Sequence, residues 1–164
     1  MKEILDKLTS YKIFNYLFPG ILFVAIAKYF TSYDFILENN FIGAFLYYFI
    51  GMVISRFGSL CIEPILKKTK FIRFSEYSEF ILASNKDKKI ELFSEVNNTY
   101  RTITAMLFLL LALKLYDHFD LQYHFAKGVS FSIAIILILV MFLLSYRKQT
   151  SYINKRITST KQQQ

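Results

Sequence analysis

The sequence predicts an all-α integral membrane protein with four transmembrane helices, an N-terminal amphipathic helix and a helical cytoplasmic loop. Hydrophobic residues make up 54% of the 164 positions, which is high for a soluble domain. They gather into four stretches, and a helix of about 20 apolar residues crosses a bilayer. The third stretch is short for a span unless its flanks extend it. The stretches are Ile13–Phe30, Phe41–Ile62, Ile103–Tyr116 and Val129–Tyr146.

The distribution of positive charge predicts the orientation of these helices. When the stretches are threaded alternately through a bilayer, 16 of the 20 Lys and Arg residues fall on one side. Only Lys28, Lys114 and Lys127 fall on the other side, and Arg56 lies within the second stretch. The positive-inside rule therefore places both termini and the middle loop in the cytoplasm. This basic layer either attracts anionic lipid headgroups or receives an anionic ligand such as a nucleotide or oligonucleotide.

Five segments follow from this threading. An interfacial amphipathic helix is predicted for residues 1–12, where Met1, Ile4, Leu5 and Leu8 recur at helical spacing. A first transmembrane hairpin covers 13–62, and a basic helical loop covers 63–101. A second transmembrane hairpin covers 102–147, and a cytoplasmic tail covers 148–164.

The first span contains a Pro-Gly pair that predicts a hinge. Pro19 lacks a backbone donor and its ring crowds the preceding turn, so a kink is expected at Pro19 and Gly20. Asn15 could supply a side-chain donor to the freed backbone. The kink is either a fixed joint between interfacial and spanning helices or a joint that moves when a pore opens.

The second span carries a stripe of small residues. Small side chains on one helix face let membrane helices approach closely, so this stripe predicts a packing seam. The seam packs either within one protomer or against another copy. Its members are Ala44, Gly51 and Gly58, spaced by seven, together with Ser55 and Ser59.

Arg56 and Glu63 fall on another face of the same helix, within about 20° of each other at 100° per residue. Arg56 either extends to the cytoplasmic headgroups or lines an aqueous vestibule, because charges within membranes often mark functional pathways. Glu63 precedes Pro64, so the helix is expected to end there.

The loop before the third span supplies the predicted ligand site. From Lys88 the pattern is helical and runs without a break into the third span, so a movement in the cytoplasm would reach the membrane directly. The polar residues at this inner mouth either bind phosphates or bases, or form an ordinary interface with headgroups. The candidate ligand-binding residues are Lys88, Lys89, Asn97, Asn98, Tyr100 and Arg101.

The sequence offers no catalytic constellation. It lacks a Gly-rich phosphate loop, a paired-His zinc motif and a nucleophile in a recognisable context, so no enzyme activity and no cofactor are predicted. Around the second outer loop, from Asp117 to Ala126, the possible metal ligands are too loosely spaced for a site, and we expect them to be solvated loop residues. They are Asp117, His118, Asp120 and His124.

Three runs carry a resemblance to a known class of protein: Tyr16-Leu17-Phe18-Pro19-Gly20, Ile54-Ser55-Arg56-Phe57-Gly58-Ser59-Leu60 and Glu95-Val96-Asn97-Asn98-Thr99-Tyr100-Arg101. With these runs the chain resembles small four-helix membrane effectors of bacterial anti-phage defence systems, namely the Hailong-type membrane effector and, more loosely, the four-span component of Kiwa. The resemblance implies a homo-oligomeric channel in the bacterial inner membrane. It also implies control by a DNA oligomer that a partner nucleotidyltransferase makes.

The expected function is therefore a gated, homo-oligomeric pore that depolarises the inner membrane under the control of a nucleotide or short DNA ligand. Four helices enclose little lumen, so conduction would need several protomers. The alternative is a non-conducting membrane anchor or scaffold that holds a cytoplasmic sensor or other partner protein.

Overall fold

The computed structural model describes residues 13–161, apart from the Phe14 side chain, and these residues form helices and loops without a strand. The amphipathic helix predicted for residues 1–12 lies outside the described residues. The first described element is a π-helical turn, η1 (Ile13–Leu17), which continues directly into α2 (Phe18–Phe30). Pro19 is the second residue of α2, and the wider π-helical turn before it accommodates the missing backbone N–H. Pro19 and Gly20 are both buried within this continuous helix.

The second apolar stretch forms a longer helix than the sequence predicts. A loop over residues 31–39 leads to α3 (Asn40–Phe57), and the Asn39 side chain caps it by accepting from the backbone N–H groups of Phe41 and Ile42. The helix does not end at Glu63, because a second π-helical turn, η2 (Gly58–Ile62), carries it into α4 (Glu63–Lys68). Pro64 cannot donate to the carbonyl four residues earlier, and the wider turn upstream accommodates this loss.

The second half of the chain consists of one short and two long helices. A loop over residues 69–76 leads to α5 (Tyr77–Lys86), which is followed by α6 (Lys89–Tyr123) and α7 (Lys127–Lys161). The continuous helix predicted from Lys88 into the third span is present as α6. The predicted outer loop from Asp117 is mostly helical, since α6 continues to Tyr123 and His124 ends it in a left-handed conformation.

Among the described residues, three helices are long and apolar enough to cross a membrane: Asn40–Lys68, Lys89–Tyr123 and Lys127–Thr160. The first apolar helix, Asn15–Phe30, is shorter. The 35 residues of α6 correspond to about 52 Å of helix, so α6 extends well beyond a hydrocarbon core of about 30 Å.

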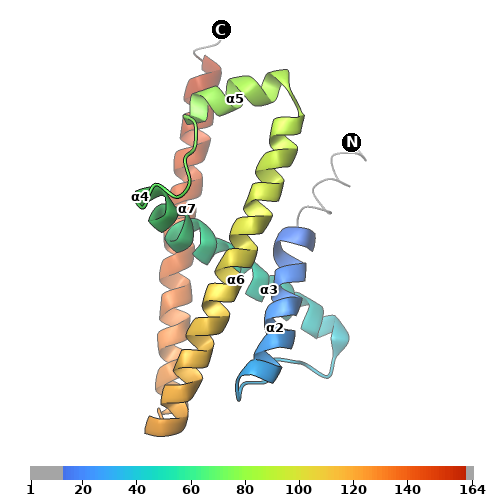
Figure 1. Ribbon diagram of the computed structural model, residues 1–164, viewed down its shortest axis with the longest axis vertical. Helices are drawn as coiled ribbons and strands as arrows, with labels where there is room; N and C mark the ends of the chain where they lie inside the picture. Colours follow the sequence, from blue (N-terminus) through green and yellow to red (C-terminus); the bar gives the residue numbers. More distant parts are fainter. Residues whose placement is uncertain (1–12, 162–164) are drawn as a thin grey trace.

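The helices pack into a bundle with α7 at its edge (Figure 1). In that view α6 and α7 run in opposite directions from their shared turn, α3 crosses them obliquely, and α5 links their far ends. We call η1, α2, α3, η2 and α6 the bundle, because these elements contact one another and supply every residue of the core cluster. The core residues are Ala27, Ile54, Ile62, Ala105, Met106 and Leu110.

Candidate functional site

Two glycines let the first helix lie directly on α3. A Cβ atom on Gly51 would overlap the backbone carbonyl of Tyr16, and one on Gly20 would overlap the carbonyl of Tyr47. Backbones approach this closely only where side chains are absent, as small-residue seams in membranes allow. The crossing places η1 against the middle of α3 and brings polar side chains of both into the interior.

A buried polar network joins η1, α3 and α6 at this crossing. The Thr102 hydroxyl lies 2.9 Å from Asn15 Oδ1 and 3.3 Å from Ser55 Oγ, and Asn15 Nδ2 lies 3.4 Å from Ser55 Oγ. Asn15, Ser55 and Thr102 are each at most 2% exposed. Buried polar groups are costly unless they are hydrogen-bonded, so this network fixes the three helices in one arrangement.

A buried carboxylate lies about two turns further along, at the start of α4. Glu63 is 6% exposed and pairs through Oε2 with Arg101 of α6, with 2.7 Å between Oε2 and the guanidinium nitrogen. Its other oxygen, Oε1, lies 2.8 Å from Lys67 Nζ in the same helix. We call Glu63, Lys67, Arg101 and Lys148 the charged cluster.

Lys148 brings α7 into the charged cluster. Its ammonium donates to the backbone carbonyl of Ser59 at 2.7 Å and to the Ser59 hydroxyl at 2.8 Å, and it lies 3.8 Å from Glu63 Oε1. Ser59 belongs to the π-helical turn η2, so these two hydrogen bonds join α7 to the bundle. One carboxylate therefore meets cations from three different helices.

The cluster carries more positive than negative charge. Three cations surround a single carboxylate, and a charge this far from water is stabilised only by its partners. Arg101 also retains a donor, since its buried Nε has no hydrogen-bond partner among residues 13–161. A second anion at this place would find both net positive charge and an unused N–H group.

Arg56 does not join Glu63, although the sequence placed them on one helix face. Its guanidinium donates to the Tyr16 hydroxyl at 3.1 Å, while Glu63 pairs with Arg101. The π-helical turn between them explains the separation, because its wider turn rotates every later residue away from the α-helical register. Arg56 is half-buried and faces the first helix.

The six predicted ligand residues do not form one site. Lys88 and Lys89 are exposed at the start of α6, about 18 Å of helix away from Arg101. Asn97 and Tyr100 are exposed, whereas Asn98 is half-buried and its carbonyl accepts a hydrogen bond from Thr102. Of the six, Arg101 alone belongs to the charged cluster.

The predicted seam lies mostly inside the protomer. Gly51, Ser55, Gly58 and Ser59 are buried, and a Cβ on Gly58 would meet the Ala105 side chain at 3.2 Å. Ala44 is exposed, and the neighbouring Gly43 occupies the buried position.

At the opposite end of the bundle, two carboxylates hold a loop in place. Asp117 is not a solvated loop residue, since it is 2% exposed and accepts from the Ser32 backbone N–H at 3.1 Å. The Tyr33 hydroxyl donates to Asp120 at 2.6 Å, and burial together with this bond raises the pKa of Tyr33. These contacts hold the loop over residues 31–39 against α6. No group of three or more metal-ligand side chains occurs within residues 13–161.

Sequence reasoning missed Lys148 and Thr102 as members of these clusters. Both have weak local signals: Lys148 follows an uncharged stretch closely, and Thr102 is a hydroxyl residue at the start of an apolar run. Neither signal indicates which residue, 40 or more positions away along the chain, will be the partner. Comparison with family models, with curated proteins and with solved structures finds no match to this chain.

Proposed function

We propose that this protein is a four-pass membrane effector that assembles with further copies into a gated pore, with the charged cluster as its switch. Three helices long enough to cross a membrane support the membrane assignment. With η1, the first apolar helix reaches about 27 Å, close to the hydrocarbon thickness. A fourth crossing would also bring both termini to the side that carries most of the Lys and Arg residues.

The observation that carries the proposal is the buried Glu63 carboxylate, which faces three cations. Glu63 holds Arg101 of α6 and, more distantly, Lys148 of α7, and both helices would cross the membrane. A ligand rich in phosphate would compete with Glu63 for these cations, and it would favour any conformation in which they are released. This is the chemistry expected of a nucleotide or short DNA regulator made by a partner nucleotidyltransferase.

A pore requires more than one copy. The interior of the bundle is filled by its own core and polar network, so a conducting path would lie between protomers. In anti-phage defence such a pore would depolarise the inner membrane. The alternative is a non-conducting anchor for a cytoplasmic partner, and the exposed basic residues of α5, α6 and the tail would serve it equally well.

Ion flux through proteoliposomes tests the proposal. Purified wild type should be closed alone and should pass ions when short DNA oligomers or cyclic nucleotides are added. Glu63→Gln should leak without ligand, because Arg101 and Lys148 lose their anionic partner. Glu91→Gln removes an exposed carboxylate from α6, the helix that carries Arg101, and should behave like wild type.

Two outcomes would redirect the interpretation. If correctly assembled wild type passes no ions under any ligand condition, the anchor function becomes the better explanation. If Arg101→Gln responds normally to ligand, the regulator binds elsewhere on the basic layer and the charged cluster is a structural joint.

A further inference from the structure

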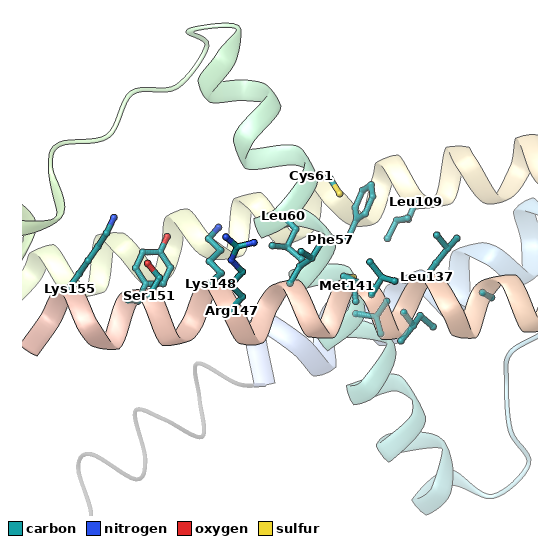
Figure 2. Close-up of a pocket in the computed structure, with 16 residues that line it drawn as sticks. Phe57, Leu60, Cys61, Leu109, Leu137, Met141, Arg147, Lys148, Ser151 and Lys155 are labelled. Carbon is teal, nitrogen blue, oxygen red and sulfur yellow. The ribbon is translucent and has the colours of Figure 1, made fainter.

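A groove of about 850 Å³ runs along α7 where it faces α3 and η2 (Figure 2). One end is apolar, with side chains from α3, η2, α6 and α7. At the other end basic and hydroxyl side chains of α7 gather, and Figure 2 shows this separation along the helix. The apolar end includes Phe57, Leu60, Leu109, Leu137, Met141 and Leu144; the polar end has Arg147, Lys148, Ser151, Tyr152 and Lys155.

The polar end continues into a second groove of about 960 Å³ between α5 and α7. Arg147, Ser151 and Lys155 line both grooves, so the two form one continuous amphipathic groove along α7. Glu76 is the acidic residue that lines the second groove. Neither Arg147 nor Lys155 makes an ion pair within residues 13–161.

The dimensions match one leaflet of a bilayer. From Ala134 to Leu144 the apolar part covers about 15 Å of helix, which is half of a hydrocarbon core of about 30 Å. The uncharged stretch of α7 ends at Tyr146, so Arg147 and Lys148 come directly at the expected boundary between hydrocarbon and headgroups.

We propose that this groove along α7 binds one anionic glycerophospholipid, with an acyl chain in the apolar part and the phosphate between Arg147 and Lys155. The charge pattern favours this occupant, because the cations among the described lining residues lie only at the end where a headgroup would be.

Lipid occupancy can be measured with a tryptophan reporter, because the chain contains no Trp. Leu137→Trp places the reporter in the groove, and Leu139→Trp places it on the opposite face of α7, outside the groove. Each variant is reconstituted in vesicles that mix phosphatidylcholine with a minor fraction of phosphatidylglycerol. The acyl chains of one lipid or the other are brominated, so that contact quenches the fluorescence.

We expect quenching at position 137 to show several-fold enrichment of phosphatidylglycerol over its bulk fraction, whereas position 139 reports the bulk composition. Adding Arg147→Gln or Lys155→Gln to the groove reporter should reduce the enrichment several-fold, and the two substitutions together should return it to the bulk fraction. Arg156→Gln removes a cation from the same helix outside the groove and should leave the enrichment intact.

Three results would overturn the proposal. Equal lipid selectivity at positions 137 and 139 would show that the groove has no specific lipid. Enrichment that survives loss of Arg147 and Lys155 would exclude them as the headgroup site. A reporter at 137 that neither brominated lipid quenches, beside a quenched reporter at 139, would show that another protein surface fills the groove. None of these measurements depends on ion flux, so the lipid site and the proposed pore are tested separately.

Discussion

The bundle and α7 differ in how their apolar side chains are covered. Every residue of the core cluster belongs to the bundle, where glycines bring backbones together and a polar network is closed. The most apolar stretch of α7 has no buried residue at all. The bundle is therefore stabilised by its own packing, while α7 depends on what surrounds it, and Lys148 with its Ser59 and Glu63 partners is a main joint between the two.

The largest expected effect is the introduction of a methyl group where two backbones touch. Gly51→Ala places a Cβ on the Tyr16 carbonyl, so η1 must move and the free energy of unfolding should fall by about 3 kcal/mol. Gly128→Ala at the start of α7 meets no atom within 4 Å and should cost nothing. Unfolding in SDS-containing mixed micelles, followed by circular dichroism, measures both. Equal stability of the two variants would show that the glycine contact is not formed.

The all-helical fold and its long apolar helices could be predicted because their signals are local. Apolar length and charge asymmetry indicate membrane helices without any knowledge of tertiary contacts, and the uninterrupted helix from Lys88 follows from its own periodicity. The continuation of the second helix past Pro64 was missed, because a π-helical turn has no reliable sequence signature and it offsets the usual effect of proline.

The candidate site could be predicted only in part. Arg101 stood out in the polar run at the start of the third span, and Glu63 stood out because it shares a predicted helix face with Arg56. Their pairing with each other depends on how α3 crosses α6 and on the rotation that η2 introduces. The same crossing angle determines that Asn15 meets Thr102, and a sequence pattern holds no information about it.

The second expected effect concerns the polar network of the bundle. Thr102→Val leaves Asn15 and Ser55 buried without the hydroxyl that joins them, so stability should fall by about 1–3 kcal/mol. Thr104→Val is the matched control on α6, because within residues 13–161 its hydroxyl bonds only to the Tyr100 carbonyl in its own helix. Identical losses from both substitutions, in the same micelle assay, would remove the network as a source of stability.

A smaller effect is expected at the joint between the two regions. Lys148→Met removes two hydrogen bonds to Ser59 but leaves Glu63 paired with Arg101 and Lys67, so the bundle should lose only about 1 kcal/mol. Cys61 lies in the groove between η2 and α7 and is the one cysteine of the chain, so its reaction with a small maleimide reports the attachment of α7.

The rate of Cys61 labelling should rise several-fold in Lys148→Met and stay at the wild-type value in Arg156→Met, a change on the same helix outside the groove. An unchanged rate in Lys148→Met would mean that other contacts hold α7. The stacked rings of Phe49 and Phe142, with centroids 6.1 Å apart, would then be the next contact to remove.

The smallest expected effect distinguishes lipid from protein as the neighbour of α7. Leu139 is 57% exposed on the face away from the groove, so Leu139→Ala should change stability by less than about 0.5 kcal/mol if that face contacts lipid. Leu110→Ala, in the core of the bundle, should cost about 2–5 kcal/mol and provides the scale. A loss of 2 kcal/mol or more at Leu139, together with a smaller particle in size-exclusion chromatography, would show that another copy covers α7. In that case the contrast between the regions exists only within one protomer, and the pore would be sought at that interface.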